Sequence, residues 1–139
     1  MQNLLNLPLD SAITDCYKTF KTKLALVAKL NDELKAYELV ESFPIEAAYD
    51  EFFKQLPEDH ERIVVVNFKY TTESDGNREK IILIHWGPSG AKIKERMVYT
   101  ASSGVFSAHL DGIAFTMRAS NVDEISYDSL RERCLGRYK

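Results

Sequence analysis

Two continuous apolar runs constrain the fold of this 139-residue chain more than any other feature. Residues 63–66 read Ile-Val-Val-Val, and residues 81–84 read Ile-Ile-Leu-Ile. A half-exposed strand alternates apolar and polar side chains, so runs of this kind predict strands that are buried on both faces. We expect strands over 63–70 and 81–86, joined by a turn at 73–77 that contains Asp75-Gly76. A sheet that is buried on both faces needs helices on each side.

The other segments supply the remaining elements of such a sheet. The sequence predicts a helix over 11–21, because Ile13, Cys16, Tyr17 and Phe20 follow helical spacing and Asp10 or Ser11 can cap its start. The sequence also predicts a hairpin with strands over 24–28 and 37–43. Two more helices are expected over 47–55 and 127–135, and a fifth strand over 113–117. Residues 121–126 read as a loop. The fold class predicted is therefore α/β of the α+β type, with about five strands flanked by helices on both faces.

The longest predicted element is a helix over 91–110. It follows the break at Gly87-Pro88-Ser89-Gly90 and ends at Asp111-Gly112. Gly104 lies inside it, costs up to about 1 kcal/mol relative to Ala, and is a natural place for a bend. An apolar stripe runs along this helix at spacings of four, four, four and three: Ile93, Met97, Ala101, Val105 and Ala108.

The start of this helix carries an unfavourable arrangement of charge. Lys92, Lys94 and Arg96 lie where unpaired N–H groups already give the helix end a partial positive charge, and Glu95 offsets only part of it. Such a positive spot can bind an acidic protein surface, a phosphate or an anionic lipid head group. The alternative interpretation is that the three side chains simply extend into water.

Composition excludes several functional classes. Residues 1–77 carry eight Lys/Arg and fourteen Asp/Glu, whereas residues 78–139 carry ten and seven. The acidic balance overall argues against nucleic-acid binding. No run approaches the roughly 18 apolar residues of a membrane span, and residues 1–8 show no secretory leader. Cys16 and Cys134 are expected to be reduced thiols in the cytosol. The carboxylates of residues 32–61 are interpreted as a solvated face.

No motif for catalysis is visible. The segment from Gly87 to Lys92 does not match a phosphate-binding loop, and no nucleophile elbow of the form GxSxG occurs. His60, His85 and His109 are isolated in sequence, without the spacing of metal ligands, so hydrogen-bonded or surface histidines are expected. We therefore expect no metal, no cofactor and no enzymatic activity.

Several segments together resemble one known family. They are Leu56-Pro57-Glu58-Asp59, Phe68 to Ser74, Arg78 to Trp86, Ile93 to Tyr99, Ser102-Ser103, Leu110 to Ile113 and Glu124 to Asp128, with Asp15-Cys16 and Phe20 nearer the start. In this order they are similar to the actin-depolymerising factor/cofilin family. The resemblance extends from Ser11 to Arg133 and is most specific across 56–103.

This resemblance implies a single domain, 1–139, with the family's fold, the ADF-homology fold, in which helices flank a mixed five-stranded sheet. It implies a monomeric, non-enzymatic, cytoplasmic protein associated with the cytoskeleton, which binds monomeric and filamentous actin and promotes filament severing and depolymerisation. Its long helix would enter a cleft on actin through Lys94, Arg96 and Met97. Filament binding would use Arg78, Lys80, Glu132 and Arg133. Phosphoinositides would compete through Lys92, Lys94 and Arg96.

The chain also departs from the family's pattern. Ser103-Gly104 and Ser107-Ala108 stand where relatives typically carry charged residues along the long helix, and residues 1–10 contain no serine in the place of the family's regulatory one. Two alternatives stay open. The chain can be a glia maturation factor-like protein that binds the actin-related nucleation complex and debranches filaments, or a peripheral phosphoinositide-binding module.

Overall fold

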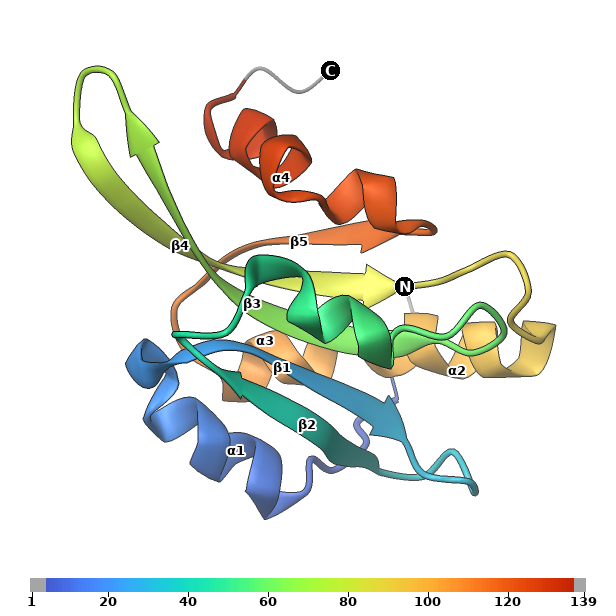
Figure 1. The fold of residues 1–139 in the computed structure, drawn as a ribbon. Coiled ribbons are helices and arrows are strands. Elements are labelled where there is room, and N and C mark those ends of the chain that lie inside the picture. The colour runs from blue at the N-terminus through green and yellow to red at the C-terminus, as the bar shows by residue number, and fades with distance from the viewer. Residues whose placement is uncertain (1–4, 137–139) are drawn as a thin grey trace.

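A single five-stranded sheet organises the computed structural model, which describes residues 5–136. Its strands are β1 (Lys23–Leu30), β2 (Tyr37–Pro44), β3 (Arg62–Thr72), β4 (Gly76–Trp86) and β5 (Ile113–Ala119). They lie in the order β2-β1-β3-β4-β5, antiparallel except for the parallel pair β4–β5 (Figure 1). The predicted mixed sheet of the α+β type is therefore confirmed.

Helices cover both faces of this sheet, as the sequence predicts. The α-helices are α1 (Ser11–Lys18), α2 (Ile93–Ser102), α3 (Gly104–His109) and α4 (Tyr127–Cys134); the 3₁₀ helices are η1 (Phe20–Thr22), η2 (Tyr49–Gln55) and η3 (Val122–Ile125). α1, α2 and α3 lie on one face, whereas η2 and α4 lie on the other (Figure 1). Two details differ from the prediction. The helix expected at 47–55 is a 3₁₀ helix, and the expected loop at 121–126 contains η3, which Asn121 and Glu124 close with a capping box.

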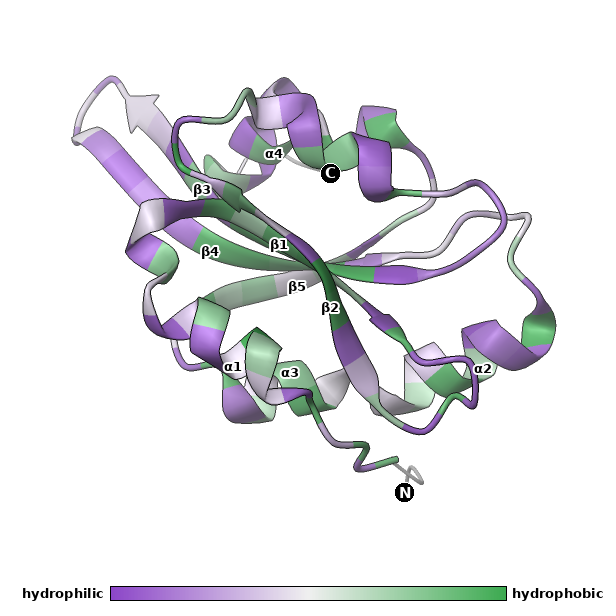
Figure 2. Cartoon of the chain, turned by 60° about the horizontal axis from the view of Figure 1, so that its bottom comes forward, coloured by the Kyte–Doolittle hydropathy of each residue, from purple (hydrophilic) through white to green (hydrophobic). Residues whose placement is uncertain are grey.

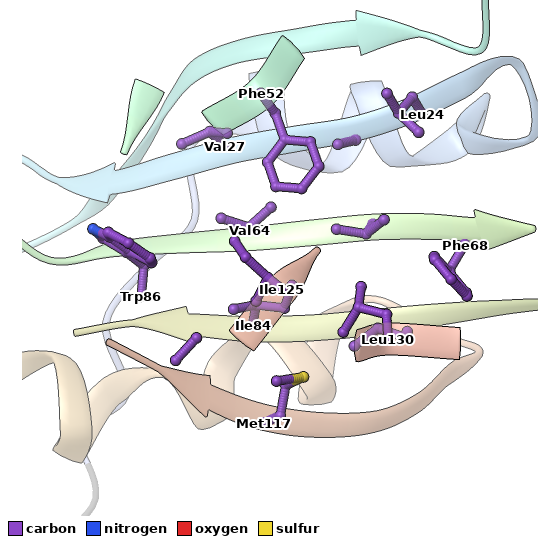
Figure 3. Close-up of a cluster of buried hydrophobic side chains, with 14 of the residues drawn as sticks. Leu24, Val27, Phe52, Val64, Phe68, Ile84, Trp86, Met117, Ile125 and Leu130 are labelled. Carbon is purple, nitrogen blue, oxygen red and sulfur yellow. The ribbon is translucent and has the colours of Figure 1, made fainter. Parts of the chain in front are cut away.

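The two apolar runs lie at the centre of the sheet and contribute to a hydrophobic core on each face. Residues 63–66 and 82–84 are at most 2% exposed. Val64 and Ile84 point toward η2 and α4, where they pack with Phe52 and Leu130 (Figure 3). The intervening side chains pack on the other face against α1, α2 and α3. Apolar segments accordingly concentrate along the middle strands, while the outer half of the β3–β4 hairpin is polar (Figure 2).

The prediction of one continuous helix over 91–110 is wrong. The segment is divided at Ser103 into α2 and α3, so the eleven-residue strands β3 and β4 are the longest elements described. Gly104 begins α3, and glycine is a poor helix former. The carbonyl of Ala101, which the N–H of Val105 would contact in an unbroken helix, accepts the N–H of Leu5 at 3.0 Å. The N-terminal segment thus satisfies a carbonyl at the break.

The predicted apolar stripe does not mark the packed side of these helices. Of its five residues only Val105 is buried, and Ile93 and Met97 are 71% and 65% exposed. The buried positions are instead Tyr99, Ser102, Val105 and Phe106. Spacing alone selected the wrong face, because a tyrosine and a serine occupy the inner side of α2.

Two further expectations concern the chain's relation to membranes. Within residues 5–136, no helix has the length and apolar character needed to cross a bilayer. The expected absence of a leader concerns residues 1–8, of which residues 1–4 lie outside the described part of the chain.

The break at Ser103 generates a prediction about glycine. A Cβ on Gly104 meets no atom within 4 Å, and its φ is not left-handed. We expect Gly104→Ala to raise the free energy of unfolding by about 0.4–1 kcal/mol. Alanine has fewer backbone conformations than glycine in the unfolded chain, and it is a better helix former. Urea denaturation measures this change. Gly112→Ala is the matched control and should lower the free energy of unfolding, since Gly112 has a φ of +92°. A higher free energy of unfolding in Gly112→Ala, or no increase in Gly104→Ala, would contradict the prediction.

Candidate functional site

The orientation of α2 is fixed by two buried hydroxyl groups on its inner side. The Tyr99 hydroxyl accepts the N–H of Leu30 at 2.8 Å. Ser102 donates its hydroxyl to the carbonyl of Val98 at 2.6 Å and accepts that of Tyr37 at 2.7 Å. Tyr99 and Ser102 are each 1% exposed. A rotation of the helix would leave the buried N–H of Leu30 and the buried hydroxyl of Tyr37 without partners, at a cost of about 1–3 kcal/mol each.

This orientation turns two apolar side chains outward. At 3.6 residues per turn, Ile93 lies opposite Ser102 and Met97 lies nearly opposite Tyr99. Ile93 and Met97 are the most exposed large hydrophobic residues between residues 5 and 136. Lys94 is exposed beside them. We call Ile93, Lys94 and Met97 the outer face of α2. Ile93 and Met97 were both assigned to the apolar stripe. The family resemblance singled out Met97 together with Lys94, whereas nothing in the sequence singled out Ile93.

Two of the three predicted cations at the helix start are free to contact a partner. Lys92 is the N-cap residue, and Lys94 lies in the first turn. Both are exposed, and neither forms an ion pair with another described residue. Their charges therefore add to the positive end of the helix dipole.

Arg96, the third cation, is already engaged inside the protein. Its Nε lies 3.5 Å from Oε2 of Glu61, its Nη2 donates to the carbonyl of Ala91 at 3.3 Å, and its side chain is 38% exposed. The Glu61 side chain is fully buried and also contacts Nε2 of His85 at 2.5 Å and Nη2 of Arg118 at 3.4 Å. We call Glu61, His85, Arg96 and Arg118 the Glu61 cluster.

The Glu61 cluster corrects one expectation and was not predicted. The carboxylates of residues 32–61 were assigned to a solvated face, which is wrong for Glu61. Its four members lie in or beside four different elements, so no spacing along the chain signals them. Glu95 reinforces the same region, because its carboxylate accepts the Glu61 N–H at 2.6 Å and contacts Nδ1 of His60 at 3.0 Å.

The histidines fit the expectation that each is hydrogen-bonded or at the surface. His60 contacts Glu95, His85 contacts Glu61, and Nδ1 of His109 contacts the carbonyl of Val105 at 2.9 Å. Among residues 5–136, no group of three or more potential ligands could hold a metal ion. Cys16 and Cys134 are free thiols.

The residues predicted for filament binding come from β4 and from α4, and α4 lies on the face of the sheet opposite α2 (Figure 1). Arg78 and Lys80 lie on β4, where Arg78 pairs with Asp75 at 3.0 Å, and Glu132 and Arg133 lie on α4. Burial raises the pKa of the Cys134 thiol, and the positive charges of Lys80 and Arg133 act against this rise. The charge of Lys80 on β4 therefore acts on a side chain of α4.

Comparisons with known proteins agree with one another. The model of the family described as cofilin/tropomyosin-type actin-binding protein matches residues 6–135. Cofilin of Ogataea parapolymorpha is 35% identical over 117 residues, covering 84% of this chain and 79% of that protein. Actophorin of Entamoeba histolytica is 31% identical over 130 residues, covering 91% and 94%. The crystal structure of Streptomyces griseoflavus cofilin has a TM-score of 0.80 at 26% identity, covering 90% of this chain and 94% of that one.

The hydroxyl of Tyr99 generates a prediction about stability and pH. Tyr99→Phe leaves the buried N–H of Leu30 without an acceptor, so the free energy of unfolding should fall by about 1–3 kcal/mol at neutral pH. Burial raises the pKa of Tyr99 to about 12. Between pH 10 and pH 12 the unfolded chain therefore loses this proton before the folded one does, and wild-type stability should fall as pH rises.

The Tyr99→Phe variant lacks this titrating hydroxyl, so its stability should fall less than that of wild type between pH 10 and pH 12. Urea denaturation across this pH range should give a shallower slope for Tyr99→Phe than for wild type, by up to about 1.4 kcal/mol per pH unit. Tyr127→Phe is the control at neutral pH, because its ring is 39% exposed and the loss should be smaller. Equal slopes in wild type and Tyr99→Phe would rule out this role for the hydroxyl.

Proposed function

This chain belongs to the cofilin/ADF family of actin-binding proteins, and we propose that it binds actin through the outer face of α2 and promotes filament disassembly. The observation that carries the proposal is the outward-facing pair Ile93 and Met97 with the unpaired Lys94 beside it. Apolar residues four apart on one helix are the usual anchors of a helix that docks in a groove.

The outer face of α2 fits a groove that is apolar at its centre and acidic at its rim. Burial of a side chain such as Ile93 or Met97 is worth about 1.5–3 kcal/mol each. Lys94 and Lys92 supply positive charge at the rim, where they steer association with an acidic surface. Arg96 joins this contact through the part of its guanidinium that Glu61 does not cover.

Filament binding would use a second surface formed by Arg78, Lys80, Glu132 and Arg133. Because α2 and α4 lie on opposite faces of the sheet, the two surfaces can contact two different actin subunits (Figure 1). Binding one filament twist better than another shifts the population of twists, and filaments break at the boundaries between them. Disassembly by this route needs only binding energy, so we propose that the chain acts without catalysis.

The two alternatives receive less support. Relatives named cofilin, actophorin and actin-depolymerizing factor do not favour a glia maturation factor-like debranching activity. Phosphoinositides would compete with actin at Lys92, Lys94 and Arg96, but the pairing of Arg96 with Glu61 leaves two fully available cations. We further propose that the chain is a monomeric, single-domain protein, 1–139, that associates with the actin cytoskeleton in the cytoplasm.

Combined substitution of the outer face tests the proposal. We expect Lys94→Ala with Met97→Ala to weaken binding to monomeric actin by at least about 2 kcal/mol, or roughly 30-fold, because it removes one apolar anchor and one charge. Both side chains are exposed, so the fold should be retained. Titration of fluorescently labelled actin measures the affinity, and co-sedimentation measures filament binding.

The matched control is Lys54→Ala on η2, which lies on the other face of the sheet (Figure 1). It removes a lysine that is also exposed and should leave the affinity for actin unchanged. Wild-type affinity in the double variant would exclude the outer face of α2 as the actin-binding surface.

Imaging of single fluorescent filaments separates the functional alternatives. Severing predicts breaks along unbranched filaments. Loss of branches without such breaks would instead support the glia maturation factor-like alternative. Binding to phosphoinositide vesicles that persists at saturating actin would support the peripheral lipid-binding module.

A further inference from the structure

A fully buried carboxylate, that of Glu61, lies beneath the first turn of α2 and belongs to neither of the predicted binding surfaces. We propose that Glu61 is a positioning residue for actin binding: it holds the start of α2 against the ends of three strands and thereby sets where Ile93, Lys94 and Met97 stand. This proposal rests on the proposed function. Glu61 itself is 0% exposed and cannot touch a partner.

The contacts of Glu61 join four parts of the fold. Glu61 precedes β3, whereas His85, Arg118 and Arg96 come from β4, β5 and α2. His85 is paired in register with Ile63 on one side and with Arg118 on the other. The two strand residues are therefore fixed by the sheet, and Arg96 is the member that belongs to a helix. The carboxylate thus connects α2 to a rigid base.

The space around this carboxylate is closed by a glycine. A Cβ placed on Gly87 would lie 2.5 Å from Nη2 of Arg118 and 3.1 Å from Oε2 of Glu61. Glycine therefore allows the Arg118 guanidinium to reach Glu61 where β4 ends. Gly87 is also held to β5, since its N–H donates to the carbonyl of Ala119 at 2.8 Å.

The charges in the cluster show what the loss of Glu61 would do. Two guanidinium groups share one buried carboxylate, so neutralising Glu61 leaves Arg96 and Arg118 as two neighbouring cations without the negative charge between them. They repel each other, and both are partly exposed and can turn toward water, at 38% and 46%. The first turn of α2 would then lose one anchor.

The second half of α2 keeps its own anchors. Tyr99 and Ser102 remain hydrogen-bonded to Leu30 and Tyr37. Loss of the Glu61 charge should therefore shift the outer face of α2 without unfolding the helix. This distinguishes positioning from a general contribution to stability.

Glu61→Gln tests the proposal because glutamine keeps the shape of the side chain and removes its charge. We expect it to weaken binding to monomeric actin by about tenfold, a typical coupling within a network of contacts. Amide hydrogen exchange should quicken at residues 95–97 and stay unchanged at β1 and β3. Leu130→Ala is the control, since it lowers stability from the opposite face of the sheet and should leave affinity unchanged.

A double-mutant cycle provides the readout that a purely structural role would not change. If Glu61 positions Met97, then Met97→Ala should weaken binding less in the Glu61→Gln background than in wild type. Arg118→Gln is a second variant, in case Glu61→Gln folds poorly. It removes the contact that ties the carboxylate to β5, so the group that holds Arg96 is less firmly placed, and it should show the same direction of coupling with Met97→Ala.

The outcomes separate this proposal from the function on which it rests. If wild type does not bind actin, both fail. If the outer-face variant weakens binding but Glu61→Gln and Arg118→Gln bind as wild type does, only the positioning role is overturned. Additive effects in the cycle, or an equal loss of affinity in Leu130→Ala, would also overturn it.

Discussion

The exposure of the outer face of α2 depends on the buried hydroxyl groups of Tyr99 and Ser102. Burial of Ile93 and Met97 would favour the opposite rotation, since each could gain about 1.5–3 kcal/mol inside the core. That rotation would leave the N–H of Leu30 and the hydroxyl of Tyr37 without partners and would expose the Tyr99 ring. The unmet hydrogen bonds together with the lost aromatic burial outweigh the gain, so these polar contacts and the burial of the Tyr99 ring together decide which side of this helix meets solvent.

Three sets of contacts then hold α2 at separate points along its length. Glu61 and Glu95 anchor its start, Tyr99 and Ser102 its second half, and the Leu5 N–H contacts the Ala101 carbonyl near its end. A surface carried on a helix held in this way is already in place before a partner arrives. Less conformational freedom is lost on binding, which favours affinity without additional contacts.

The sequence predicted the sheet well because four-residue apolar runs such as 63–66, bounded by turn residues, are typical of strands buried on both faces. It failed where the deciding interactions join distant residues. The sequence marks Gly104 as a place for a bend, but one glycine does not show that the helix divides there, and the hydrogen bond from Leu5 at the break joins distant residues. The buried charge of Glu61 could not be distinguished from the surface carboxylates that precede it in sequence. Lys94 was found through the charge pattern at the helix start and the family resemblance, and Met97 through the resemblance, whereas Ile93 required knowledge of which side of α2 is packed.

The start of α2 combines features that each weaken the isolated fold. Lys92 and Lys94 lie at the positive end of the helix dipole, where each cation is unfavourable by about 0.3–1 kcal/mol. Ile93 and Met97 leave apolar surface in water on the same turn and the next. Only Arg96 has its charge compensated, and the compensating carboxylate is inside the protein. An apolar groove with an acidic rim would relieve both kinds of cost at once, so the arrangement fits a partner with that chemistry better than it fits the stability of the chain alone.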